Sequence, residues 1–199
     1  ETVKTEKDIF DLFQSQFPDA IKLIPNLIED FQKNPTGDLA SVYCKPWHLG
    51  DKALLIGDAA HAVAPFFGQG MNASFQDCST LAKLMGQNEN DWNTIFNAFS
   101  STQVENGHAI ADMALENYLE MRDHVNDPEY KKRRNVELKL ERMFPGQFIP
   151  RYSMVSFHQI PYAEVYQRGG KQFKIIGDVL KADPSGQSID KAMVEKMLP

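Results

Sequence analysis

The sequence predicts a mostly α-helical chain with a few strands. Apolar residues recur at helical spacing over most of the 199 residues, as Ile9, Phe13 and Phe17 do near the start. Only two short stretches, 39–47 and 52–58, are typical of strands, and proline or glycine bounds each. Because two strands make a poor sheet, they either pair with each other at the edge of a helical domain or belong to a larger sheet outside this sequence.

Capping residues and prolines set the bounds of the expected helices. Thr5 and Asp8 form a capping signal that starts a helix over 5–17. Pro18 and Pro25 then break the chain into short helical pieces. Asp91 is expected to cap one later helix, and the pair Asp127-Pro128 to start another. The later helices are expected from Met71 onward and over 92–100, 104–125, 128–143, 162–180 and 188–198, with a short extended segment or turn at 152–157.

Composition and charge exclude several classes of protein. The apolar fraction of 42% and the charged fraction of 24% are ordinary for a globular domain. A net charge of -6 and a pI near 5.4 leave no basic excess to neutralise phosphates, which argues against a nucleic-acid or anionic-membrane binder. No stretch approaches the roughly 18 to 20 apolar residues of a spanning helix. A cytoplasmic protein is expected, with Cys44 and Cys78 as small buried hydrophobes rather than a disulfide framework.

The stretch LLIGDAAHAVAPFFGQGMN, residues 54–72, holds the candidate binding residues. Residues 54–56 predict a buried strand that ends at Gly57. Asp58 follows at the carboxyl end of that strand, which is where open α/β sheets bind ligands. A carboxylate there can accept hydrogen bonds from the hydroxyls of a ribose or ribitol. Spacing alone leaves a second interpretation open, in which Asp58 only caps the next helix.

Two glycines near the end of this stretch predict a second binding feature. Gly68-Gln69-Gly70 offers unhindered N–H groups at a helix N-terminus, which favours an anionic or electron-rich group. His61, beside alanines, is expected to be packed or hydrogen-bonded rather than catalytic. No HExxH, CxxC or paired-carboxylate spacing supports a metal site or a hydrolase, and the sequence has neither a Walker A loop nor GxGxxG.

Three separated blocks resemble one family of flavoenzymes. GDAAH followed by PFFGQGMN, within residues 57–72, resembles the second FAD-binding motif of the class A flavoprotein aromatic hydroxylases. ENYLEMRDHV at 116–125 and FIPRYSMVSFHQIPYAE at 148–164 resemble the kynurenine-hydroxylating branch of that family. The resemblance covers about residues 40–170. It implies the C-terminal part of an α/β FAD-binding fold plus a C-terminal helical domain.

The resemblance also implies domain bounds and cofactor contacts. Residues 1–50 would end a substrate and sheet domain, 51–105 would complete the FAD-binding domain, and 106–199 would form a helical domain that contributes to the substrate pocket. Asp58 would hold the ribitol of FAD. Five residues at the helix start would contact the pyrimidine edge of the isoalloxazine ring: Gly68, Gln69, Gly70, Met71 and Asn72.

Residues from all three blocks would form the substrate side of the site. A proline and two phenylalanines would face the aromatic ring, and an asparagine and a tyrosine would bind the amino-acid end of L-kynurenine. Without the resemblance, Met121 and Tyr152 would be interpreted as ordinary packing residues. The implied substrate-binding residues are Pro65, Phe66, Phe67, Asn117, Glu120, Met121 and Tyr152.

The implied reaction is hydroxylation of L-kynurenine to 3-hydroxykynurenine. NADPH would reduce FAD, and O2 would then form a flavin C4a-hydroperoxide in a pocket that excludes water. Because the first FAD motif of the family, GxGxxG, is missing, the implied partner is the N-terminal half of the same enzyme, and the chain alone is expected to be inactive. Residues 181–199 are polar where mammalian members have a membrane anchor, which implies a bacterial relative. The alternatives are a hydroxylase of another aromatic substrate and a non-catalytic helical interaction module.

Overall fold

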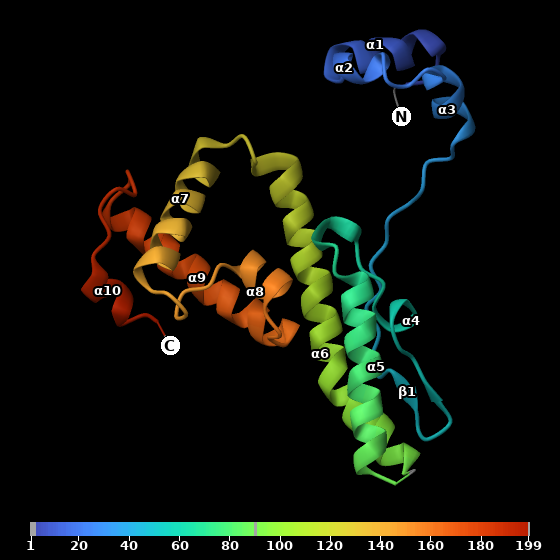
Figure 1. Ribbon diagram of the computed structural model, residues 1–199, viewed down its shortest axis with the longest axis vertical. Coiled ribbons are helices and arrows are strands. Elements are labelled where there is room, and N and C mark those ends of the chain that lie inside the picture. The colour runs from blue at the N-terminus through green and yellow to red at the C-terminus, as the bar shows by residue number, and fades with distance from the viewer. Residues whose placement is uncertain (1–2, 90, 199) are drawn as a thin grey trace. The chain divides into compact units, whose positions relative to one another are not determined.

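The computed structural model in Figure 1 describes residues 3–89 and 91–198. The described residues are 66% helix and 2% strand, which confirms the prediction of a mostly helical fold. It divides into two compact units, Glu1–Leu39 and Ala40–Pro199. The functional domains expected over 1–50, 51–105 and 106–199 stay a prediction, because compact units do not assign function.

The first unit is a group of short helices that begins as the capping signal predicts. Thr5 Oγ1 accepts a hydrogen bond from the Asp8 amide at 3.2 Å, and Asp8 Oδ2 accepts one from the Thr5 amide at 2.8 Å. This reciprocal pairing satisfies two amide donors that a helix start leaves unpaired. Ile9 and Leu27 are the buried apolar residues of this unit. Its helices are α1 (Glu6–Gln16), α2 (Pro18–Ile21) and α3 (Leu27–Lys33).

A short hairpin lies near the start of the second unit. Strand β1 (His48–Leu49) pairs antiparallel with β2 (Ala53–Leu54), and His48 lies opposite Leu54. Gly50 makes the turn with a φ of 57°, a left-handed conformation that suits glycine. The second expected stretch, 52–58, therefore supplies β2, but its partner strand begins just after the first expected stretch, 39–47.

The predicted bounds of both strands are wrong. Residues 40–46 are extended but form no ladder, and isolated bonds hold the stretch instead, such as the one from the Val42 amide to the Ala62 carbonyl at 2.8 Å. Leu55 and Ile56 were expected to be buried, yet they are 42% and 38% exposed. Leu55 and Ile56 stay exposed because the sheet has only two strands among the described residues, so no larger sheet surrounds them.

Two long helices form the centre of the second unit. Helix α5 (Gly70–Gln87) packs against α6 (Trp92–Leu119), and Figure 1 shows them side by side. Helix α6 joins the two helices expected over 92–100 and 104–125, and it passes into a π-helical turn, η2 (Glu120–His124). Asp91 caps α6, as predicted. Within the described residues, no helix has the length and apolarity needed to cross a membrane.

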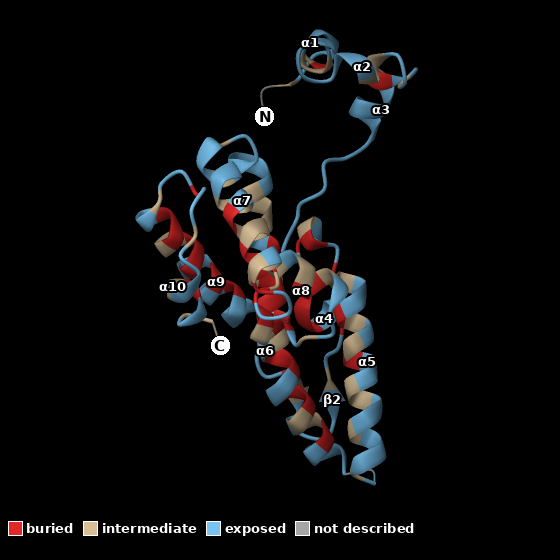
Figure 2. Cartoon of the chain, turned by 60° about the vertical axis from the view of Figure 1, so that its left-hand side comes forward, coloured by how far each residue is buried: buried red, intermediate tan, exposed pale blue. Residues whose placement is uncertain are grey.

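Helix α5 leaves several of its apolar residues exposed and buries a polar one. Met71 and Phe75 are 68% and 64% exposed, while Asp77 is buried on the side toward α6. Cys78 is exposed and Cys44 is half-buried, so neither is the fully buried hydrophobe expected. Figure 2 shows α5 largely pale blue and tan, in contrast to the red stripe of buried residues along α6. The described residues thus leave Met71 and Phe75 of α5 uncovered.

Four helices complete the second unit. Asp127 caps the first of them by accepting a hydrogen bond from the Glu129 amide at 2.9 Å, as predicted. Residues 152–157 were expected to be extended or in a turn, but they are helical, because this places Met154 and Val155 together in the core. These helices are α7 (Pro128–Met143), α8 (Arg151–Phe157), α9 (Tyr162–Ala182) and α10 (Lys191–Glu195).

Trp47 joins the hairpin segment to α6. It is 1% exposed, its Nε1 donates to the Cys44 carbonyl at 3.0 Å, and its amide donates to Ser100 Oγ at 3.1 Å. The indole ring lies directly against Gly107, where an added Cβ would come within 2.7 Å of the ring. Only glycine at this position lets the ring approach the helix so closely.

We predict that Gly107→Ala destabilises the protein by about 1–3 kcal/mol, because the methyl group overlaps the Trp47 ring. The matched control is Gly177→Ala in α9, where a Cβ meets nothing within 4 Å. That variant should gain roughly 0.5–1 kcal/mol from helix propensity. Urea unfolding followed by circular dichroism measures both changes. Equal stabilities for the two variants would contradict the close Trp47 contact.

Candidate functional site

The turn after β2 places Asp58 on the surface. Gly57 has φ 59° and ψ -143°, and a Cβ there would lie 3.1 Å from Ser74 Oγ. Asp58 is the first residue of the one-turn helix α4 (Asp58–His61), and its side chain is exposed. Gly57 is the N-cap of this helix, so the capping role considered for Asp58 is not what the structure shows. The carboxylate faces solvent at the end of the turn.

The start of α5 presents backbone N–H groups beside a short 3-10 turn, η1 (Pro65–Phe67). Gly68, with φ 66°, connects this turn to Gln69, the N-cap of α5. The Gln69 side chain is buried, and its Oε1 accepts hydrogen bonds from Tyr162 Oη at 3.1 Å and Asn72 Nδ2 at 3.0 Å. An 18-residue helix that starts here carries a partial positive charge at this end. An electron-rich ligand edge is the chemistry that such an end favours.

A buried polar network lies behind both features. Asp77 Oδ2 accepts hydrogen bonds from the Gly57 amide at 2.9 Å and from His61 Nε2 at 2.6 Å, and Oδ1 accepts one from Gln103 Nε2 at 2.9 Å. Asp77 and His61 are 2% and 1% exposed, and the imidazole lies with its centroid 5.1 Å from that of Trp47. His61 is therefore packed and hydrogen-bonded, as predicted. Sequence reasoning missed Asp77, because a lone aspartate within a helix gives no motif.

The predicted substrate residues gather around η1. Asn117 Nδ2 donates to the Phe66 carbonyl at 2.7 Å and lies 3.7 Å from Met121 Sδ. The Phe67 ring stacks on that of Tyr152, with centroids 5.7 Å apart and planes inclined by 23°. The structure thus brings the first sequence block into contact with the second through Asn117, and with the third through Tyr152.

Two neighbouring residues lie differently from the expectation. Tyr118 was not predicted, yet its ring packs on Phe66 with centroids 4.4 Å apart. Its position next to Asn117 in the second block was the available signal. Glu120, expected to line the same pocket, interacts with Tyr130 of α7 instead: burial, together with the hydrogen bond from Tyr130 to Glu120, raises the pKa of Tyr130 to about 12.

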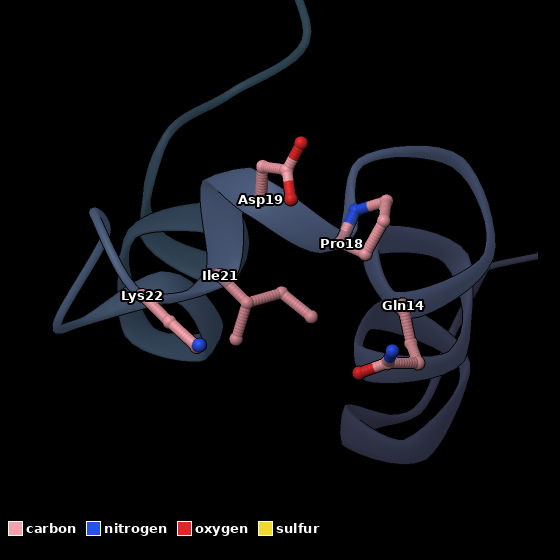
Figure 3. A pocket seen from close by; sticks show the side chains of 5 residues that line it. All are labelled: Gln14, Pro18, Asp19, Ile21 and Lys22. Atoms are coloured by element: carbon pink, nitrogen blue, oxygen red, sulfur yellow. The ribbon is translucent and has the colours of Figure 1, made fainter.

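The described residues include a surface hollow in each unit. One is in the first unit, and Figure 3 shows it between Pro18 and Ile21 with three polar side chains around it. The other lies beside Arg133 and Phe173. Neither hollow is lined by a predicted site residue. The first hollow is lined by Gln14, Pro18, Asp19, Ile21 and Lys22.

Comparison with known proteins identifies the relatives of this chain. Residues 6–95 match the FAD binding domain family. A kynurenine 3-monooxygenase of Myxococcus xanthus is 47% identical over 178 residues, which cover 89% of this chain and 38% of the relative. Over most of its length, the chain is similar to this monooxygenase. The kynurenine 3-monooxygenases of Cytophaga hutchinsonii and Xanthomonas euvesicatoria are each 41% identical, over 90% and 99% of the chain and 40% and 43% of their own lengths.

These matches confirm the resemblance recognised from the three sequence blocks. Residues 6–95 match an FAD binding domain, and the relatives that match most of the chain have the name kynurenine 3-monooxygenase. The chain spans about two fifths of the length of these relatives. The roles of individual site residues stay predictions.

We predict that Asn117→Ala loosens η1, because the Phe66 carbonyl loses its donor. The expected loss of stability is about 1 kcal/mol. Hydrogen exchange of the Gly68 amide, which closes η1 by donating to the Pro65 carbonyl at 3.1 Å, should become faster. Asn97→Ala is the matched control, since Asn97 is exposed on the same helix and bonds only within it. Unchanged Gly68 exchange in Asn117→Ala would contradict this role.

Proposed function

We propose that this chain is part of an FAD-dependent, NADPH-using monooxygenase that hydroxylates L-kynurenine to 3-hydroxykynurenine. The observation that carries the proposal is the identity of 41–47% to three relatives with the name kynurenine 3-monooxygenase. The exposed Asp58 carboxylate and the start of α5 support it, because the Gly57 amide next to Asp58 donates a hydrogen bond to the buried Asp77 of that helix. A cytoplasmic location in a bacterium is part of the same proposal.

The residues of the cofactor side fit FAD by their chemistry. The Asp58 carboxylate is exposed and would accept hydrogen bonds from two ribitol hydroxyls. The peptide groups of Gly68 to Asn72 would lie along the pyrimidine edge of the flavin, where reduced flavin carries negative charge and a helix N-terminus stabilises it. Bound FAD would supply the redox and oxygen chemistry, with NADPH as reductant and O2 as oxidant. The chain would bind and orient the cofactor.

The residues around η1 would hold the substrate. Phe66 and Phe67 provide an apolar surface that would exclude water from the reacting ring. Asn117 already uses its amide nitrogen on the Phe66 carbonyl, so its amide oxygen is the atom that would accept a hydrogen bond from the substrate ammonium. Tyr152, 52% exposed and stacked on Phe67, would direct its hydroxyl to the amino-acid end of kynurenine. Met121 and Pro65 would line the same surface.

We infer that the N-terminal half of the same enzyme supplies the other wall of this site. The relatives are more than twice as long as the region that the chain matches. Four apolar side chains just before Asp58 and in the first two turns of α5 are exposed, and we propose that they form one apolar patch of the kind that marks an interaction surface. We call these residues the apolar face: Leu55, Ile56, Met71 and Phe75, which are 42%, 38%, 68% and 64% exposed.

The proposed function predicts that the full-length protein with this sequence forms a hydroxylated product. Incubated with NADPH and L-kynurenine, it should form 3-hydroxykynurenine, detected by chromatography. Asp58→Ala should weaken FAD binding roughly tenfold or more, because charge-assisted hydrogen bonds to the ribitol are lost. Asp51→Ala, an exposed aspartate in the hairpin turn, is the control and should bind FAD normally.

The same assay distinguishes the alternatives. A folded full-length protein that purifies without flavin and leaves kynurenine unchanged would overturn the proposal and favour an interaction module. Large increases in the KM for kynurenine in Asn117→Ala and Tyr152→Phe support kynurenine as substrate. An unchanged KM in both variants would point to another aromatic compound.

The apolar face yields a separate prediction for the full-length protein. Phe75→Ser should lower its stability by about 3 kcal/mol, because the ring would be buried against the N-terminal half. Phe173→Ser is a matched control, since Phe173 is also 64% exposed and its stacking with Arg133 is worth only about 0.5–1 kcal/mol. Urea unfolding compares the two. Equal losses would show that the apolar face is not an internal interface.

A further inference from the structure

The two proposed cofactor contacts lie on separate segments, and their spacing has to be maintained. Asp58 follows the hairpin, whereas the flavin edge would lie at the start of α5. Helix α4, which begins with Asp58, has only four residues and is too short to be stable by itself. Something outside α4 must hold it against α5.

The Asp77 carboxylate holds both ends of α4. Its Oδ2 accepts hydrogen bonds from the amide of Gly57, the N-cap, and from Nε2 of His61, the last residue of the helix. His61 Nδ1 has no partner among the described residues, so Asp77 is the group that orients this ring. Because Asp77 itself lies on α5, these two bonds connect the Asp58 turn directly to that helix.

The network continues from Asp77 to the start of α9. Gln103 donates to Asp77 Oδ1 and accepts from Asn106 Nδ2 at 3.1 Å. Asn106 Oδ1 in turn accepts a hydrogen bond from the Ala163 amide at 3.1 Å. The residue before Ala163 is Tyr162, whose hydroxyl donates to Gln69 Oε1. These hydrogen bonds, with the peptide link between Tyr162 and Ala163, connect the Asp58 turn to α5, α6 and α9. They end at Gln69, the residue that precedes α5.

A carboxylate is the side chain that these surroundings require. Three N–H donors, from Gly57, His61 and Gln103, point at two oxygens that are nearly fully buried. An asparagine would turn an NH2 group toward at least one donor, and a leucine would leave all three donors unpaired in the interior. Burial of a polar group is tolerated only when it is paired in this way.

We propose that Asp77 is the positioning residue of the FAD site. It keeps Asp58 within reach of the ribitol and at a set distance from the N-terminus of α5, and it does not itself touch the cofactor. This inference rests on the proposed function, in which Asp58 and the start of α5 contact FAD. No other group on α5 links that helix to the Gly57 amide among the described residues.

The test uses the full-length flavoprotein and the variants Asp77→Asn and Asp77→Leu. FAD affinity is measured by fluorescence titration, and the visible spectrum and reduction potential of the bound flavin are recorded. Asp77→Asn keeps one acceptor oxygen and should raise the Kd for FAD several-fold; Asp77→Leu should raise it roughly tenfold or more. The reduction potential should fall in both variants, because the helix N-terminus no longer lies at its proper place beside the reduced flavin.

Val136→Ala separates positioning from stability. Val136 is fully buried in the cluster formed by α7, α9 and α10, away from this network, so its truncation lowers stability without touching α4. The control should keep the wild-type Kd, spectrum and potential. If Asp77→Leu fails to fold, Asp77→Asn alone decides the question. A wild-type Kd and potential in Asp77→Asn would overturn the inference and leave the function intact, whereas a wild-type protein that binds no FAD would overturn both.

Discussion

Three hydrogen-bond donors from two segments converge on the buried carboxylate of Asp77, and the centre of the second unit depends on that convergence. A carboxylate that is 2% exposed is stable only when its oxygens are paired. The pairing brings together the Gly57 turn, His61 and Gln103 of α6. Trp47 packs over the His61 ring, and Gly107 gives the indole the space to do so. The hairpin, α4, α5 and α6 therefore take their places around one buried charge.

This arrangement shows how the exposed turn at Asp58 is held in place. Asp58 is exposed, yet Gly57 next to it is buried, as are Asp77 and His61, which are hydrogen-bonded to each other behind the turn. A binding group gains from such preorganisation, because little conformational freedom is left to lose when the ligand arrives. On the other side, the η1 turn is held in the same manner by Asn117 and by the stacked rings of Phe67 and Tyr152.

The exposed apolar residues of α5 can be compared with the greater length of the relatives. An amphipathic helix normally turns its apolar residues toward a core, but α5 uses Asp77 and small residues for packing on α6 and leaves Met71 and Phe75 exposed. The pattern makes physical sense if a second layer of protein covers that side. The relatives have more than half of their length outside the matched region, which is ample for such a layer.

The sequence by itself determined the features that depend on local interactions. Caps at Thr5, Asp91 and Asp127 were predicted correctly, because each is a bond between residues two or three positions apart. The helical character of the chain and the flavoenzyme motif were likewise readable from spacing and residue type. Only the tertiary structure decided where the strands end, that residues 152–157 are helical, and which face of α5 is buried. It also decided the role of Asp77, whose partners lie 16, 20 and 26 residues away and share no pattern with it in the sequence. Burial and long-range pairing select among local preferences, and they are properties of the assembled fold.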